Sequence, residues 1–224
     1  GAAAIDLLRD RPEEALAVAR EVIAVLDAAW GTDHEAVLRL TALLTGVLAD
    51  AIPSADRATV DRWLAECVGL AARAEEVADR ADPLGEESRV WRARMRADLL
   101  RLRWRAGEHV GLEELLEAWR EPVRGFEAYG HVYEAARSRL RLAEILRASG
   151  ERGEAEEMWA AVAAAAASLP SDPLLSALAE ARGAGPAGAT TAGAATAGAT
   201  TAGAATGSPN LTAREIEVLH LLAR

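Results

Sequence analysis

Apolar side chains recur every three or four positions through the first 182 residues, and no stretch sustains an alternation of period two. In the segment that follows Ser54, for example, Val60, Trp63, Cys67 and Ala71 fall on one stripe of a helix. The pattern predicts an all-α protein with helices over residues 12–29, 33–51, 54–80, 84–106, 111–129, 132–149, 152–168 and 172–182. The joining segments are short, so consecutive helices are expected to pack antiparallel.

Local signals mark several of the helix starts. Asp82 precedes Pro83, which suits a capping carboxylate followed by a proline in the first helical turn. Thr32 and Asp33 lead into Glu35 at the start of the second predicted helix, and Ser54 is expected to open the third. These residues predict helix starts near positions 33, 54 and 84.

A weak internal repeat links two of the predicted helix pairs. The turn Arg105–Glu108 recurs as Ala148–Glu151 at an offset of 43 residues. The second copy has its small and bulky residues at Leu142, Ala143, Leu146, Ala155, Trp159 and Val162. This arrangement resembles a tetratricopeptide repeat, although the offset exceeds the usual spacing of about 34 residues. The resemblance implies an irregular solenoid of helical hairpins over residues 1–182.

The predicted helix 84–106 is apolar on two opposite sides. One stripe contains Trp91, Met95, Leu99, Leu102 and Ala106, and the smaller one contains Val90, Ala93, Ala97, Leu100 and Trp104. Arginines separate the stripes, with Arg89, Arg92, Arg96 and Arg103 on one edge and Arg94, Arg101 and Arg105 on the other. Only Asp98 interrupts this series. Such a helix is expected to lie between two neighbouring layers.

The arginines of this helix suggest two alternative roles. Arg89, Arg92, Arg96 and Arg103, together with Trp104, could bind an anionic ligand in a groove. Alternatively, they pair with acidic stripes of adjacent helices such as Glu113, Glu117 and Glu121. The chain carries 35 acidic against 25 basic residues, a formal net charge of −10. This surplus favours ion pairing.

Composition excludes several chemistries. All 25 basic residues are arginine, so there is no lysine for a phosphate-binding loop or a Schiff base. Cys67, the single cysteine, excludes an intrachain disulfide and is expected to pack in the core. The four histidines (His34, His109, His131 and His220) lack the spacing of zinc ligands and are expected to be exposed or capping. We therefore predict a non-enzyme without a metal or cofactor in this chain.

Tryptophan is the most frequent aromatic residue, with six tryptophans against two tyrosines and one phenylalanine. The tryptophans could line a groove for an apolar ligand or a peptide helix. Their spacing of about one per predicted helix favours a simpler role, in which each fills gaps between alanine-rich helices.

Residues 183–210 differ from everything before them. From Gly183 to Ala213 there is no charged residue, and a ten-residue Ala/Thr/Gly unit that starts at Ala189 is nearly repeated from Ala199. The segment is too poor in large apolar residues to cross a membrane or to bury a core. We predict a flexible, disordered tether.

The last fourteen residues, 211–224, are amphipathic again and begin with a capping box formed by Thr212 and Glu215. Their order resembles the first helix of the LuxR-type helix-turn-helix domain. The matching residues are Leu211, Thr212, Arg214, Glu215, Glu217, Val218, Leu219 and Leu222. Ile216 stands where that family usually has a polar residue. The turn and the recognition helix that complete the family pattern do not follow before Arg224.

The resemblance implies part of a bacterial transcription regulator, in which a helical-repeat sensor or assembly domain is tethered to a DNA-binding domain. A chain that starts at Gly1 and stops at Arg224, each inside a helical pattern, is expected of a fragment. The expected partners are DNA, through the complete parent protein, and a small-molecule or protein ligand of the repeats. The protein is expected to be cytoplasmic, homo-oligomeric and not membrane-bound. The alternative is a helical-repeat adaptor that docks partner proteins without binding DNA.

Overall fold

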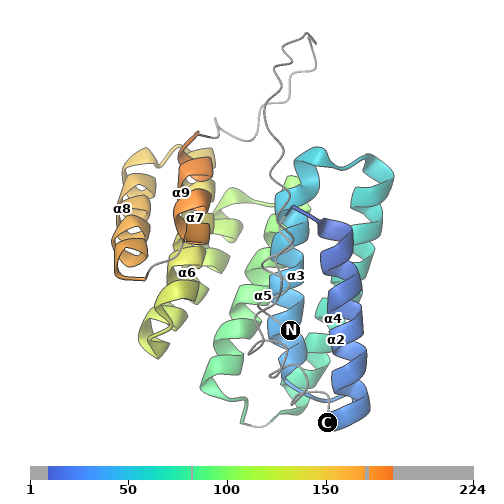
Figure 1. Ribbon diagram of the computed structural model, residues 1–224. Coiled ribbons are helices and arrows are strands. Elements are labelled where there is room, and N and C mark those ends of the chain that lie inside the picture. The colour runs from blue at the N-terminus through green and yellow to red at the C-terminus, as the bar shows by residue number, and fades with distance from the viewer. Residues whose placement is uncertain (1–9, 82, 170–171, 184–224) are drawn as a thin grey trace. The chain divides into compact units, whose positions relative to one another are not determined.

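The computed structural model describes residues 10–81, 83–169 and 172–183 (Figure 1). This part of the chain is helical, without a strand, which confirms the predicted all-α class. The helices are α2 (Pro12–Trp30), α3 (Ala36–Ala51), α4 (Arg57–Arg80), α5 (Glu86–Arg105), α6 (Leu112–Tyr129), α7 (Val132–Ser149), α8 (Arg152–Ser168) and α9 (Asp172–Gly183). A short 3-10 helix, Ile52–Ser54, follows α3.

The predicted starts of three helices were early by two or three residues. Helix α4 begins after Asp56, whose carboxylate accepts a 2.8 Å hydrogen bond from the Thr59 amide, whereas the Ser54 hydroxyl donates to the Ala51 carbonyl. Helix α5 begins after Gly85 without a side-chain cap, so Pro83 is not in its first turn. Helix α3 likewise begins without a side-chain cap. Thr32 and Asp33 instead lie in the turn before α3, and Ser54 is the last residue of the 3-10 helix, whereas Asp82 lies outside the described residues.

The repeated turn seen in the sequence is also repeated in the structure. Gly107 and Gly150 both have a left-handed backbone, with φ of 84° and 93°. In each turn the amide of the following glutamate donates to the carbonyl five residues earlier, at 3.0 Å from Glu108 and 2.8 Å from Glu151. Glycine suits these positions because it adopts positive φ without steric cost. The turns after α5 and α7 are therefore built alike, and the turn after α6, with Gly130 at φ 81° and a 2.9 Å hydrogen bond from the His131 amide to the Phe126 carbonyl, has the same geometry.

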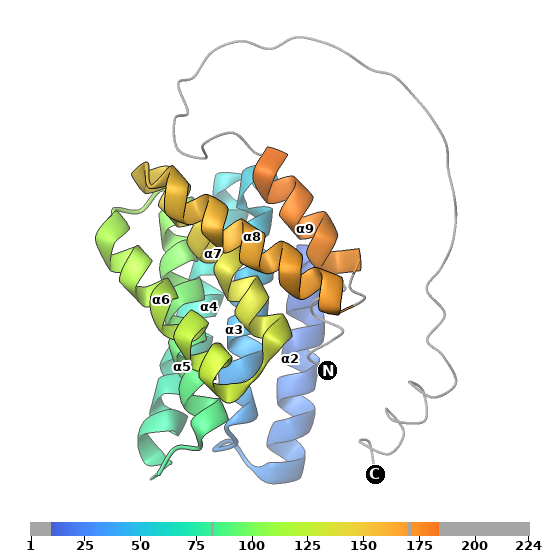
Figure 2. The same ribbon diagram turned by 90° about the vertical axis from the view of Figure 1, so that its left-hand side faces the viewer.

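Consecutive helices pack against each other from α2 to α9, and α3 also packs on α5, as α7 does on α9 (Figures 1 and 2). Two apolar clusters result. The first unites α2, α3, α4 and one side of α5, with Leu38, Leu44 and Trp63 among its buried residues, and it also includes Phe126 of α6 and Ala135 of α7. The second unites the other side of α5 with α6, α7, α8 and α9, and Trp119 and Trp159 lie within it.

Helix α5 lies between these two clusters, as its two apolar stripes predict. Trp91, Met95 and Leu102 belong to the first cluster, whereas Ala97 belongs to the second, with Trp104 half-buried against it. Val90 is an exception, because it joins the first cluster rather than the second.

Most predictions for individual core residues are confirmed. Trp63, Trp91, Trp119 and Trp159 are buried, but Trp30, at the end of α2, is 66% exposed. Cys67 is fully buried, and burial raises the pKa of its thiol to about 12. The prediction for His34 was wrong. Its ring is buried, and Nε2 lies 3.0 Å from an Asp27 carboxylate oxygen.

Helix α3 and the following 3-10 helix, Ala36–Ser54, are long and apolar enough to span a membrane by length and composition. Of this stretch 72% is buried against other helices, as expected for the core helix of a bundle. Its hydrophobicity therefore has an explanation inside the domain.

The predictions for the C-terminal region lie outside the described residues. Helix α9 ends at Gly183, one residue beyond the predicted end. The predicted tether after that residue and the whole LuxR-like segment, residues 211–224, stay predictions.

Candidate functional site

The predicted anion-binding edge of α5 is mostly engaged in ion pairs. Arg92 contacts Glu75 and Asp79 of α4, and both Nε and Nη2 of Arg96 donate to Glu75 at 2.6 Å. Arg103 donates to Glu108 at 2.6 Å. Ion pairing with an adjacent helix is therefore found for Arg92 and Arg96, whereas Arg103 pairs with a residue of the turn that follows its own helix. Of the predicted set, Arg89 is exposed and has no side-chain partner among the described residues.

The acidic partners differ from those expected. The sequence suggested Glu113, Glu117 and Glu121 of α6, but the partners of Arg92 and Arg96 lie on α4. Glu117 instead pairs within its own helix, with Arg120 and Arg124. The reason is geometric, because this edge of α5 faces the preceding helix rather than the following one.

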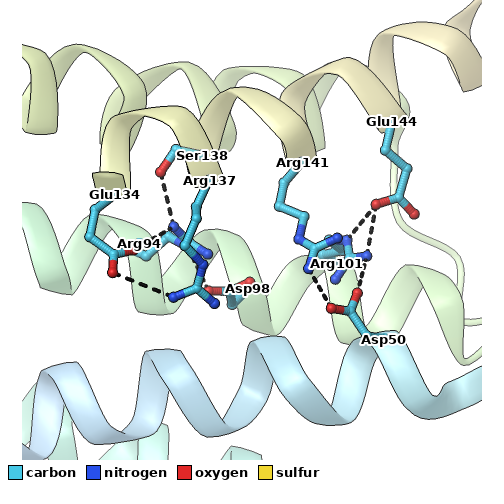
Figure 3. Close-up of polar contacts among 9 residues, drawn as sticks. All are labelled: Asp50, Arg94, Asp98, Arg101, Glu134, Arg137, Ser138, Arg141 and Glu144. Carbon is cyan, nitrogen blue, oxygen red and sulfur yellow. Dashed lines mark hydrogen bonds and ion pairs between the residues drawn. The ribbon is translucent and has the colours of Figure 1, made fainter. Parts of the chain in front are cut away.

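The opposite edge of α5 is buried and forms an ionic network with α3 and α7 (Figure 3). Its first half, the Arg94 cluster, consists of Arg94, Asp98, Glu134, Arg137 and Ser138. Arg94 donates from Nε to Asp98 at 2.7 Å and from Nη1 to the Ser138 hydroxyl at 2.9 Å. Glu134 lies 3.6 Å from Arg94 and 3.4 Å from Arg137. Two guanidiniums thus meet two carboxylates, and the cluster is electrically balanced.

The Arg94 cluster lies deep in the protein. Arg94 is 2% exposed, and Asp98 and Ser138 are completely buried. The Arg94 guanidinium also lies 4.8 Å from the centre of the Trp119 ring, where a cation–π interaction adds to its stabilisation. Gly46 of α3 makes room for Asp98, because a Cβ atom there would lie 3.3 Å from Asp98 Oδ1. The glycine therefore lets α3 approach the charged side of α5.

The second half, the Arg101 cluster, joins the end of α3 to α5 and α7. It consists of Asp50, Arg101, Arg105, Arg141 and Glu144. Figure 3 draws these residues except Arg105. Arg101 donates to Asp50 at 2.7 Å and to Glu144 at 2.8 Å. Arg105 lies 3.2 Å from Glu144, and Arg141 binds Asp50. Three guanidiniums surround two carboxylates, which leaves one surplus positive charge.

All five groups of the Arg101 cluster are charged at neutral pH. Burial alone would raise the pKa of the Asp50 carboxyl, but the three neighbouring guanidiniums outweigh burial and hold it well below its usual range. The same balance lowers the pKa of Glu144. Burial and the nearby Arg101 lower the pKa of Arg141 to about 10, which still keeps it protonated. Ionised carboxylates held by guanidiniums are suited to joining helices rather than to proton transfer.

The sequence missed this network because it placed Arg94, Arg101 and Arg105 on a polar edge of α5. One available signal was the repeat offset itself. Arg101 and Glu144 are 43 residues apart, so they hold equivalent positions in the two related segments. Residues at equivalent positions of stacked repeats are neighbours in space. Opposite charges at that offset therefore predict a contact between α5 and α7.

Acid titration should reveal the Asp50 contribution. A carboxyl group whose pKa is lowered on folding stabilises the protein above its unfolded pKa of about 3.9. That stabilisation is lost as the pH falls through the lower folded value. Between about pH 5 and pH 2, the free energy of unfolding should fall more steeply in the wild type than in Asp50→Asn. Urea titrations at a series of pH values measure the two slopes.

Asp61→Asn provides the matched control, because Asp61 is exposed and pairs with Arg57 at the surface. This variant should keep the wild-type pH dependence. Equal slopes for wild type and Asp50→Asn would show that the buried ion pairs do not hold the Asp50 carboxyl in its charged form.

No protein-family model, curated protein or solved structure matches the chain. The proposed function therefore rests on the residues of the chain itself. Within the described residues, no group of three or more His, Cys, Asp or Glu side chains is placed to hold a metal ion.

Proposed function

We propose that this chain is part of a cytoplasmic bacterial transcription regulator, in which tetratricopeptide-like helical repeats sense or assemble and a tether leads to a LuxR-type DNA-binding domain. The observation that carries the proposal is the segment Leu211–Arg224, which matches the opening helix of that domain at nearly every position that defines the pattern. The order of a helical domain, an uncharged segment and this motif is consistent with the proposal.

The helical domain supports the repeat part of the proposal. Its consecutive helices pack as neighbours, and the turns after α5 and α7 share one glycine geometry at the repeat offset. Proteins of stacked helix pairs offer extended surfaces for ligands and for other copies of themselves. We infer that this domain receives a signal or mediates homo-oligomerisation, and that the tether lets two DNA-binding domains reach neighbouring half-sites.

DNA binding by an extended protein tests the proposal. The chain up to Arg224 lacks the helix that would read base edges, so it should show no sequence-dependent binding to any duplex. Extending it by about fifty residues of the parent gene should add a complete helix-turn-helix. At a stated salt concentration, the extended protein should prefer its own promoter DNA over random DNA by about a thousandfold or more. Fluorescence anisotropy with labelled duplexes measures both affinities.

Two results would overturn the proposal: an extension that encodes no helix-turn-helix, or an extended protein that binds all duplexes alike. Substituting the capping pair in the extended protein, Thr212→Ala with Glu215→Ala, gives an internal control. These changes should weaken the first helix and reduce specific binding, since a capping box satisfies free amides at the helix start.

The second candidate is a helical-repeat adaptor that docks proteins without binding DNA. Exposed apolar side chains favour it, because Val25 and Trp30 on α2 are 52% and 66% exposed. Exposed aromatic residues are common in protein interfaces. An extension without a DNA-binding domain would favour this candidate.

A further inference from the structure

A pocket of about 400 Å³ lies where α7, α8 and α9 meet, and it shares no residue with the ionic network of α5. Its lining residues are Arg147 at the end of α7, Arg152, Glu156 and Trp159 along α8, and Arg182 at the end of α9. The volume is within the range of about 300–1,000 Å³ that is usual for small-molecule sites. Three helices therefore contribute to one cavity of a size that suits a small organic molecule.

One positive charge of the lining has no counter-charge in the part of the chain that the structure describes. This charge belongs to Arg152, which is exposed and makes no hydrogen bond or ion pair with a described residue. Arg182 and Glu156 form a loose ion pair with each other, at 3.8 Å. Arg147 is engaged within the protein, because it donates a 2.9 Å hydrogen bond to the Ala181 carbonyl. A ligand with a single anionic group therefore complements Arg152.

The second feature of the lining is a stack of guanidiniums on an indole ring. The guanidiniums of Arg147 and Arg182 lie 5.2 Å and 5.8 Å from the centre of the Trp159 ring, within the range of cation–π contacts. Trp159 is almost completely buried, so it offers a ligand little surface of its own. The Arg182 side chain, in contrast, is 47% exposed. Because guanidiniums stack on aromatic faces, Arg182 offers a ligand a place for an aromatic ring.

The stacking groups are held in place before a ligand arrives. Trp159 fixes the position of Arg182 from below, and the hydrogen bond from Arg147 to the Ala181 carbonyl ties α7 to the end of α9. Side chains that are already oriented lose less conformational entropy when a ligand binds. This arrangement therefore lowers the cost of binding at the α9 side of the pocket.

We propose that this pocket binds a small aromatic monocarboxylate. The carboxylate pairs with Arg152, since guanidinium and carboxylate groups share a planar, bidentate geometry. The aromatic ring stacks on the guanidinium of Arg182, which adds one aromatic layer to the Trp159–Arg182 contact. The ligand thus joins a residue of α8 to a residue of α9.

The test measures the binding of three probes to the full chain by calorimetry at physiological salt. Benzoate carries both the charge and the ring, cyclohexanecarboxylate carries the charge alone, and benzyl alcohol carries the ring alone. Benzoate should bind saturably and more tightly than cyclohexanecarboxylate, by about two- to fivefold for one exposed cation–π contact. Benzyl alcohol should show no saturable binding. Equal affinities of the two carboxylates would contradict the stacking on Arg182 and overturn the proposal.

Arg152→Glu should weaken the binding of both carboxylates by about tenfold, because it replaces an attraction by a repulsion. Arg89→Glu is the matched control, since Arg89 is also exposed, also lacks a side-chain partner in the described residues and lies on α5. Both variants change the net charge equally, but only Arg152→Glu should lose affinity. Equal losses in the two variants would show non-specific attraction of anions and would rule the site out.

Arg182→Lys separates the planar guanidinium from its charge. The ammonium keeps the positive charge near Glu156 but lacks the flat face that stacks on a ring. This variant should still bind both carboxylates and should lose most of the preference for benzoate over cyclohexanecarboxylate. An unchanged preference would place the ring elsewhere than on Arg182 and contradict the proposal.

Hydrogen exchange of residues 172–183 gives a readout of where the ligand binds. Saturating benzoate should increase amide protection in α9, and Arg152→Glu should remove this effect. The absence of saturable benzoate binding, or unchanged protection of α9 at saturation, would overturn the proposal. None of these outcomes depends on DNA binding, so a failure of this proposal is distinguishable from a failure of the proposed function.

Discussion

Replacing Asp98 by alanine should lower the free energy of unfolding by about 3–5 kcal/mol, because it leaves a buried arginine without its closest counter-charge. Arg94 is 2% exposed and cannot turn into solvent without disrupting α5. Its remaining carboxylate neighbour, Glu134, lies 3.6 Å away and is shared with Arg137. Urea unfolding followed by circular dichroism gives the free energy of unfolding for wild type and variant.

Two further variants separate charge from shape. Asp98→Asn keeps the side-chain volume beside Gly46 but removes the charge, so it should lose most of the same stability. The double variant Arg94→Met with Asp98→Leu removes both charges and leaves Glu134 paired with Arg137. Replacing a buried ion pair by apolar residues is often close to neutral, so the double variant should be more stable than Asp98→Ala. A double variant less stable than the single one would contradict this account.

Gly125→Ala and Gly69→Ala should change stability in opposite directions, although both place alanine inside a helix. A Cβ atom at Gly125 of α6 would lie 2.9 Å and 3.0 Å from the two methyl carbons of Val90 on α5. Overpacking of this kind costs about 1–3 kcal/mol, which offsets or exceeds the gain in helix propensity of about 1 kcal/mol. At Gly69 of α4 a Cβ would meet nothing within 4 Å, so only the gain should appear.

The difference between the two alanine variants should be about 1–3 kcal/mol in the free energy of unfolding. Val90→Ala should relieve the clash, so the pair Val90→Ala with Gly125→Ala should be more stable than the sum of the single effects predicts. Thermal and urea unfolding of the wild type, Val90→Ala, Gly125→Ala and the double variant complete this cycle. Strict additivity would show that α5 and α6 adjust to the extra methyl group without strain.

The helix pattern could be predicted from sequence because burial imposes a period of three to four residues on an alanine- and leucine-rich chain. The same periodicity makes the two apolar sides of α5 evident from its amino acids. Helix starts were less accurate, because residues such as Ser54 can serve either a cap or a turn with similar hydrogen bonds. The choice depends on tertiary packing that the local sequence does not contain.

The candidate site was predicted on one edge of α5, whereas the buried ionic network lies on the other, and the reason is also tertiary. The local sequence of a helix with many arginines does not indicate which edge is buried, because the carboxylates that neutralise the arginines come from other helices. Asp50 and Glu144 are 51 and 43 residues from Arg101. Only comparison of equivalent repeat positions would have linked Arg101 to Glu144. Arg147 of α7 and Arg182 of α9 both contact the Trp159 ring for the same non-local reason.

The position of α5 between two apolar clusters has a consequence for how the domain melts. Either half of the helical domain loses the support of α5 when the other half unfolds, because this helix contributes side chains to both. The ionic network adds further links from α5 to α3 and α7. The contacts of α5 therefore disfavour unfolding of the terminal helices one after another, and the domain should unfold in a single cooperative transition. Its calorimetric and van't Hoff enthalpies of unfolding should then agree.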